Sequence, residues 1–436
     1  MDILKETSQY QEFMVEHRRY LHRHPELSGL EFNTVEHIKG VLEESGIEYV
    51  EVPDGGILGF IHGKQPGKTV LLRADIDALP ILEDASNTAC PKFTVSENEG
   101  VCHACGHDAH PAMLMAAGKV LKAHEDEFNG TVILMFERGE ENTENLLKIF
   151  KYTEVHNMHI DSSFAIHCEN SVDTGKITIN PKNVSAGSFT FSLKLHGHGG
   201  HGSRPDLANS PIECFVAIYQ ALSAIRLRKV DPFMPLTFSI GCVQAGSASN
   251  AIPMDLEFKG TARFYDFIAG KTFKENMIKI LDQLCPVYNC TWDGYMGGIN
   301  RATVNNSTCV ELAHKALGEV FGEENLTSIE PSMGSETMSR ALMKWPGVYC
   351  HLGTGNDAKG SRGKAHTPEF DIDEDAMKYG AAAHVAYALA FLASDIDTEP
   401  DAYKGTFAQM SIEEGAKQER IDYFLGKTDE LVLLST

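Results

Sequence analysis

The hydrophobic pattern of this 436-residue chain changes its period partway along, and this change restricts the folds that it can adopt. In the first part, short apolar runs at 68–74, 130–136 and 163–167 alternate with longer segments, and 112–121 has helical spacing. Short buried strands that alternate with helices are typical of a mostly parallel sheet covered on both faces. We therefore predict an α/β domain whose ligands bind beyond the carboxyl ends of the strands.

The middle of the chain follows a different pattern, because apolar and polar residues alternate with a period of two. Such one-sided alternation predicts half-buried antiparallel strands. Strands and helices in turn are expected at 189–195, 212–225, 236–242, 254–264, 273–284 and 288–292. The order β-α-β-β-α-β is the ferredoxin-like signature. We predict that residues 185–297 form an inserted α+β domain, and that residues 1–184 and 298–436 form one domain with a central mixed sheet flanked by helices.

The composition excludes several classes of partner. Asp and Glu outnumber Lys and Arg by 61 to 38, a net charge of -23. Nucleic acid and anionic membranes both require a basic surface, so neither is expected as a partner. The longest apolar stretch, 381–393, is too short to span a bilayer and reads as a buried helix. The ten cysteines have no framework spacing and the N-terminus resembles no signal peptide, which favours a cytoplasmic protein with reduced thiols.

The strongest chemical signal is the sequence Val-Cys-His-Ala-Cys-Gly-His-Asp-Ala-His at 101–110. Incidental histidines at a helix start are the alternative, but the chain has only 19 His and 10 Cys, which makes such a cluster improbable by chance. A structural zinc site would require a second C-x-x-C pair to complete the one at Cys102 and Cys105, and the sequence has none. The segment therefore indicates an open metal site.

Further ligand types follow other predicted strands. Glu140 and Glu141 come directly after an apolar run, His167 ends another, and His366 follows a glycine-rich stretch. A carboxylate pair at a strand end is costly unless cations hold it. One of the pair can bind a metal while its neighbour handles a proton. Cys, His and Glu side chains at strand ends of one domain suit two metal ions that share a bridging group.

These segments closely resemble the metal-dependent aminoacylase and peptidase family, in the branch of hippurate hydrolase and indole-acetyl-amino-acid hydrolase. The resemblance rests on motifs in the family's order at 17–26, 72–80, 103–108, 139–141, 199–202, 250–253, 260–263 and 366. It implies that the metal ligands are Cys105, His107, Glu141, His167 and His366, with the cysteine as the bridging ligand. It also implies that Glu140 is the general base, and that the substrate-facing residues on the inserted domain are His201, Asn250 and Arg263.

The family implies an activity and an assembly as well. The expected reaction is hydrolysis of the amide bond of N-acyl amino acids by a metal-activated water. The expected cofactors are two divalent ions per subunit, zinc or manganese first and cobalt or nickel as alternatives. The inserted domain is expected to act as a lid and to form a homodimer through its sheet edge, with His201 reaching the neighbouring subunit's site.

Two segments depart from the family pattern, and three other functions stay open. Glu137-Arg138-Gly139 stands where the family usually has Gln-Pro-Ala, and 335–338 stands where it often has Ala-Glu-Asp-Phe. A dipeptidase or carboxypeptidase of the same family would use an acidic group to bind the free amine, and Glu137 is the candidate for that group. A non-catalytic metal-binding protein and a redox-active thiol protein with Cys102 and Cys105 free of metal are the remaining alternatives.

Overall fold

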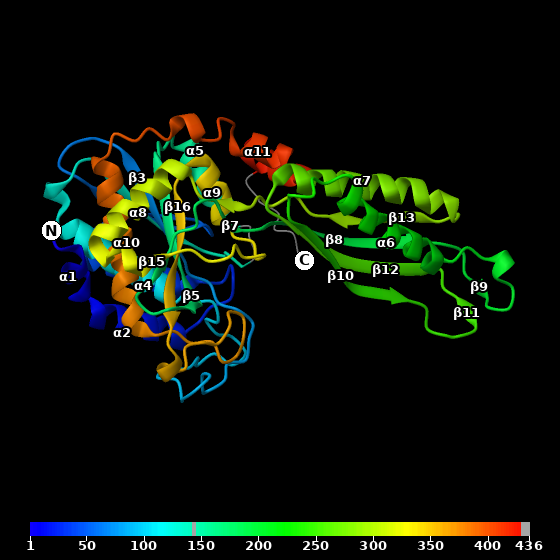
Figure 1. Ribbon diagram of the computed structural model, residues 1–436, viewed down its shortest axis with the longest axis horizontal. Coiled ribbons are helices and arrows are strands. Elements are labelled where there is room, and N and C mark those ends of the chain that lie inside the picture. The colour runs from blue at the N-terminus through cyan, green and yellow to red at the C-terminus, as the bar shows by residue number, and fades with distance from the viewer. Residues whose placement is uncertain (142–144, 429–436) are drawn as a thin grey trace. The chain divides into compact units, whose positions relative to one another are not determined.

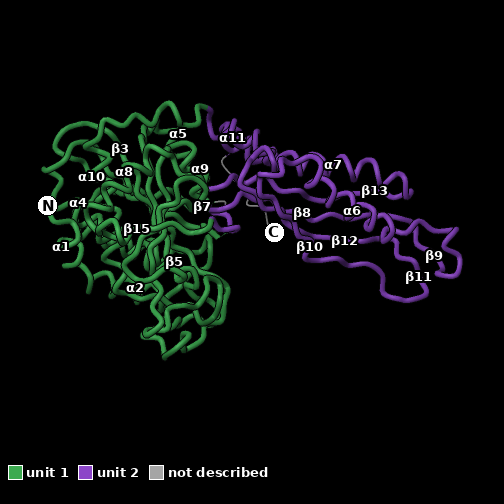
Figure 2. The backbone as a smooth tube through the Cα atoms, viewed as in Figure 1, with its two compact units in different colours: residues 1–184, 304–330, 337–404 green, residues 185–303, 331–336, 405–436 purple. Residues whose placement is uncertain are grey.

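The computed structural model describes residues 1–141 and 145–428, which fall into two compact units (Figure 2). Among the described residues, unit 1 comprises 1–141, 145–184, 304–330 and 337–404, and unit 2 comprises 185–303, 331–336 and 405–428. Across this described part of the chain, none of the helices combines the length and apolarity that crossing a bilayer requires. All ten cysteines are free thiols.

Unit 1 is built on an eight-stranded mixed sheet of order β1-β2-β4-β3-β5-β16-β6-β15. Its four central strands are parallel: β4 (Thr131–Glu137), β3 (Thr69–Asp75), β5 (Ser162–Asp173) and β16 (Val348–Gly355). Antiparallel pairs join the remaining strands to this centre: β1 (Glu48–Val52), β2 (Gly56–His62) and β6 (Ile177–Thr178), with β15 (Leu326–Thr327) parallel to β6. The predicted central mixed sheet is thus confirmed, and its parallel strands end at one edge.

Helices α4 (Ala109–Ala123), α8 (Ser307–Phe321) and α10 (Met377–Ala393) pack together in the main core of unit 1 (Figure 1). Helix α10 is apolar on all sides, as expected for a fully buried helix. The other helices of the unit are α1 (Ile3–Ser8), α2 (Gln11–Arg23), α3 (Phe32–Glu44), α5 (Leu146–Val155) and α9 (Met338–Lys344). Because α4 is packed in this core, it also holds in place the His- and Cys-rich motif at its N-terminus.

Unit 2 contains an antiparallel sheet of order β10-β12-β8-β13 with helices α6 and α7 packed on one face (Figure 1). In chain order the elements are β8 (Gly187–His196), α6 (Pro211–Arg228), β10 (Leu236–Ala245), β12 (Asp255–Phe264), α7 (Phe267–Val287) and β13 (Thr291–Met296). The predicted order β-α-β-β-α-β is therefore observed. The unit also has a short pair of β9 (Gly200–His201) with β11 (Ala251–Ile252), and elsewhere in the chain β7 (Asn183–Ser185) pairs with β14 (Thr303–Val304).

The C-terminal segment differs from the domain boundaries expected from sequence. Residues 405–428 were expected with unit 1, but α11 (Phe407–Glu413) and α12 (Gln418–Phe424) group with unit 2. Arg301 pairs with Glu413 at 2.7 Å, and Lys417 lies over the ring of Tyr295. Because these contacts join residues more than 100 positions apart, the polar C-terminal sequence shows no local sign of them.

Candidate metal centre

Cys105 and His107 occupy a tight turn that leads directly into α4. Gly106 between them has a φ of +90°, and a Cβ there would lie 3.0 Å from the Cβ of Cys168 on β5. A glycine tolerates both the left-handed backbone and the close approach. The turn therefore brings a thiol and an imidazole up to the carboxyl ends of the parallel strands.

Hydrogen bonds fix which nitrogen of each imidazole carries the proton. The Nδ1 of His107 lies 3.1 Å from the backbone oxygen of Asp77, and the Nδ1 of His167 lies 2.8 Å from that of Cys168. A carbonyl oxygen can only accept, so both Nδ1 atoms carry a proton, which leaves Nε2 as the atom through which each ring can bind a metal. Among the described residues, the buried Nε2 of His107 has no hydrogen-bond partner. Such an orphaned acceptor is suited to a cation.

The Cys105 thiol completes this set of donors. Its Sγ lies 3.5 Å from the Nε2 of His167, and ligand atoms of Cys105, His107 and Glu141 all lie within 4.8 Å of one another. Burial raises the pKa of Cys105, but His107 and His167 outweigh that effect and hold the pKa well below its ordinary value. Burial instead raises the pKa of Cys102 to about 12. The two thiols of the C-x-x-C sequence therefore have opposite environments, which argues against a redox pair.

The two glutamates after β4 point to different partners. The backbone N–H of Glu141 donates to Asp77, and Glu141 Oε1 lies 3.2 Å from the Nε2 of His366. Glu140 is only 8% exposed and accepts a hydrogen bond from the backbone N–H of Thr337 at 3.2 Å. Glu141 thus faces His366 and the Cys105 thiol, while Glu140 is held by Thr337.

His366 reaches the site from a loop that is far away in sequence. Its φ of +64° is unusual for a residue with a side chain, and its backbone N–H donates to the carbonyl of Ala104 at 2.7 Å. Its partners Cys105 and Glu141 raise its pKa to about 10. The structure therefore brings together the side chains predicted as ligands: Cys105, His107, Glu141, His167 and His366.

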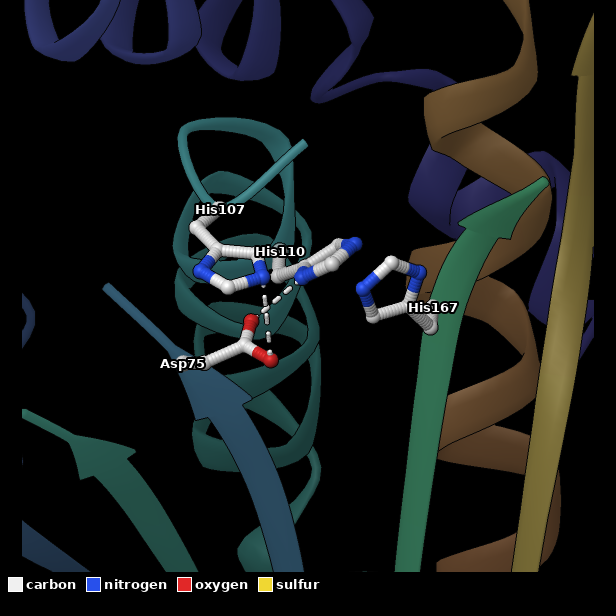
Figure 3. Close-up of side chains that lie close together, drawn as sticks. All are labelled: Asp75, His107, His110 and His167. Carbon is white, nitrogen blue, oxygen red and sulfur yellow. Dashed lines mark hydrogen bonds and ion pairs between the residues drawn. The ribbon is translucent and has the colours of Figure 1, made fainter. Parts of the chain in front are cut away.

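Sequence reasoning assigned no role to three further residues at this site: Asp75, Asp77 and His110. Asp75 ends β3 and lies with His107, His110 and His167 in a compact cluster (Figure 3). The alternation of Asp75 and Asp77 at a strand end was the available signal. It could not show that both carboxylates face histidines from the next motif along the chain.

The departures from the family pattern have structural partners. Arg73 donates to Glu137 and Asp75, each at 2.7 Å, and to the Thr337 hydroxyl at 2.9 Å. Glu137 is fully buried, so it is unsuited to binding a substrate amine, contrary to the interpretation of its sequence position. The guanidinium of Arg73 therefore binds one residue from each of the two unusual segments, Glu137 from 137–139 and Thr337 from 335–338.

The substrate-facing residues predicted from sequence all lie in unit 2. His201 is exposed, and its Nδ1 accepts the backbone N–H of Ser203 at 3.1 Å, so its Nε2 carries the proton and can donate. Asn250 is exposed. Arg263 on β12 is half-buried and donates to the Ser335 hydroxyl at 3.2 Å, and no carboxylate of the described residues forms an ion pair with it.

Comparisons with known proteins agree with this geometry. Residues 71–390 match Peptidase family M20/M25/M40. The chain is 35% identical to Thermostable carboxypeptidase 2 of Saccharolobus solfataricus over 88% of its own length and 97% of that protein. It is 30% identical to IAA-amino acid hydrolase ILR1-like 4 of Arabidopsis thaliana, over 89% and 88% respectively. The structure of a dinuclear metal binding M20 peptidase, YXEP of Bacillus subtilis, matches with a TM-score of 0.75 at 27% identity, covering 88% of this chain and 99% of that one.

The mixed sheet and the convergent Cys, His and Glu side chains define a metal-dependent hydrolase of amide bonds. The chain belongs to peptidase family M20/M25/M40. This membership confirms the family resemblance that the sequence motifs indicated.

Proposed function

We propose that this protein deacylates N-acyl amino acids, using two divalent metal ions held in unit 1. The observation that carries the proposal is the convergence of the Cys105 thiol, the two Nδ1-protonated imidazoles and Glu141, with the neighbouring residue Glu140 held by Thr337. Zinc or manganese suits this mixture of nitrogen, oxygen and sulfur ligands best, with cobalt or nickel as alternatives. The proposed ligands are Cys105, His107, Glu141, His167 and His366.

Two divalent ions, when bound, supply a water of lowered pKa and polarise the scissile carbonyl. Cys105 would hold both ions as a thiolate, because its thiol lies close to His107, Glu141 and His167 and its lowered pKa favours the thiolate. Glu140 removes the proton from the water and delivers it to the leaving nitrogen. The backbone N–H of Thr337 donates to one oxygen of Glu140 and so helps to orient the proposed base.

Unit 2 supplies the proposed recognition groups. His201 donates through Nε2 to the oxyanion that develops on the carbonyl oxygen. Arg263, half-buried and lacking a described carboxylate partner, binds the carboxylate of the amino-acid half, and Asn250 assists. We propose unit 2 as the lid and dimerisation domain.

The proposed assembly is a homodimer through the edge of the unit 2 sheet. Strand β10 is an edge strand, and Val216 and Tyr219 on α6 are about half exposed. An open edge flanked by exposed apolar side chains invites pairing with a second copy. The ten free thiols support a cytoplasmic location.

A peptidase activity is the second candidate, because the 35% identical relative is named a carboxypeptidase. The amine of a dipeptide would need an acidic partner. Glu137, the residue expected for that role, is buried against Arg73. This contact favours acylated substrates, in which the nitrogen carries no charge.

The Glu140→Gln variant tests the proposed function. If Glu140 is the base and not a ligand, this variant should keep about two ions per chain while kcat for N-acetyl, N-benzoyl or indole-acetyl amino acids falls by about 10²–10⁴-fold. Metal content is measured by mass spectrometry after gel filtration. Glu141→Gln is the matched control, since loss of a ligand should lower metal content as well as turnover. Near-normal turnover in Glu140→Gln would refute the assignment, and faster cleavage of dipeptides than of acylated substrates would favour the peptidase.

A further inference from the structure

His110 lies beside two of the proposed metal ligands, His107 and His167. It occupies the first turn of α4 and is 2% exposed. The centroid of its ring is 5.4 Å from that of His107 and 4.5 Å from that of His167 (Figure 3). Its position makes it an apparent candidate for a ligand of the same centre.

Its hydrogen bonds exclude that role. The backbone N–H of Cys168 donates to the Nε2 of His110 at 3.0 Å, so Nε2 must be the acceptor and Nδ1 carries the proton. That Nδ1 proton is donated to the Oδ1 of Asp75. Neither nitrogen therefore retains a lone pair for a cation.

Hydrogen bonds also hold both oxygens of the Asp75 carboxylate. Its Oδ1 accepts from His110, and its Oδ2 accepts from Arg73 at 2.7 Å. The same Oδ2 lies 3.6 Å from the Nε2 of His107, the atom that has no hydrogen-bond partner among the described residues. Both oxygens thus face fixed donors, and the carboxylate has only one orientation next to the ligand.

These bonds tie three elements together at one point. His110 belongs to α4, Asp75 ends β3 and Cys168 lies on β5. The two ligands beside it come from different elements, because His107 lies in the turn before α4 and His167 lies on β5. The ring of His110 therefore contacts both ligand rings, which also contact each other with centroids 5.6 Å apart, and it ties the start of α4 to the two strands.

We propose that His110, held in one tautomer by Asp75 and Cys168, is a positioning residue that sets the relative positions of the two proposed ligands His107 and His167. This inference rests on the proposed function, since it requires two ions. Partners that orient metal ligands typically contribute 10–100-fold to metal affinity.

The His110→Phe variant tests the proposal with Mn²⁺ as the probe. Phenylalanine keeps the ring volume but loses both hydrogen bonds. We expect bound Mn²⁺ to fall from about two ions per chain to about one, or its affinity to weaken at least about 10-fold. The electron paramagnetic resonance spectrum should change from that of a coupled pair to that of isolated ions. His110→Gln, which has both an N–H donor and a carbonyl acceptor, should restore part of the affinity.

The matched control is His384→Phe, the same substitution at another buried histidine, on α10. This variant should bind two coupled ions. Two ions with wild-type affinity and a coupled spectrum in His110→Phe would overturn the proposal while leaving the proposed function intact. A wild-type protein that never binds two ions would contradict both.

Asp75→Asn is a second route if His110→Phe does not fold by circular dichroism. Both oxygens of Asp75 accept hydrogen bonds, one from His110 and one from Arg73. The asparagine amide would turn its own N–H group toward one of these two donors and lose that hydrogen bond. Binding of Mn²⁺ should weaken, and wild-type binding in a folded Asp75→Asn protein would overturn the proposal.

Discussion

Cys105 has an environment that favours its thiolate, because His107 and His167 hold its pKa well below the ordinary value. A thiolate shared by two cations should be shielded from alkylation. We expect iodoacetamide to label Cys105 in native, chelator-treated protein, and added Zn²⁺ or Mn²⁺ to protect it, as judged by peptide mass mapping. Cys90, which is partly exposed, is the control and should react equally under both conditions. Equal labelling of Cys105 with and without metal would argue against ligation.

Arg263 supports a prediction about specificity. A half-buried guanidinium without a described acidic partner is suited to a substrate carboxylate. Losing one side of such a pair costs about 2–5 kcal/mol. Arg263→Ala should therefore reduce kcat/KM for N-acyl amino acids far more than for their amides or esters. Lys259→Ala removes an exposed cation from the same strand and should spare both substrate types. Equal losses on both types in Arg263→Ala would leave it a structural residue.

At the scale of elements, α2 and α3 meet at a pair of histidines. The Nδ1 of His17 lies 2.8 Å from the Nε2 of His37, whose ring stacks on Tyr20. Burial first, and then His17 and His24, lowers the pKa of His37 to about 4. The unfolded chain, with a pKa of about 6.5, takes up this proton more readily. The resulting stability is fully present above about pH 6.5 and is lost as the pH falls toward 4.

The prediction concerns the slope of stability with pH. His37→Phe keeps an aromatic ring on Tyr20 and removes the titrating group, so its melting temperature should fall less between pH 7 and pH 5 than that of the wild type. His156→Phe provides the control, because His156 is an exposed imidazole that stacks on Tyr152. If the melting temperatures of the wild type and of His37→Phe depend on pH in the same way, burial in the His17–His37 pair does not lower the pKa of His37.

At the scale of the whole molecule, the proposed dimer makes each active site depend on two chains. If His201 acts on its neighbour's site, Glu140→Gln and His201→Ala subunits are each inactive alone. Mixing them under exchange should restore activity, because one site of each heterodimer then has both residues intact. Analytical ultracentrifugation should report a dimer for each variant. Subunit exchange can be verified with subunits of different mass. If the subunits exchange but activity does not return, His201 acts in the site of its own chain or has no role in catalysis.

The sequence by itself determined the elements and the ligand types. The change of hydrophobic period predicted the strands and helices of both units, because burial on one or both faces of a strand is visible residue by residue. The carboxylate pair of Glu140 and Glu141 was also identifiable, since it is costly at a strand end without a cation, whereas the family resemblance implied the roles of Cys105 and His366. The same local logic could not place residues 405–428, whose partners in unit 2 lie more than 100 residues away.

Only the tertiary structure decided which groups meet and in which protonation state. The cluster of Asp75 and His110 brings together two strands and the start of a helix, and the tautomer of His110 depends on the backbone N–H of Cys168. The burial of Glu137 against Arg73 likewise argues against the amine-binding role for which it was a candidate in the peptidase alternative. Hydrogen bonds act over about 3 Å between elements that the sequence separates, so their pairing is fixed by packing and cannot be read from local pattern.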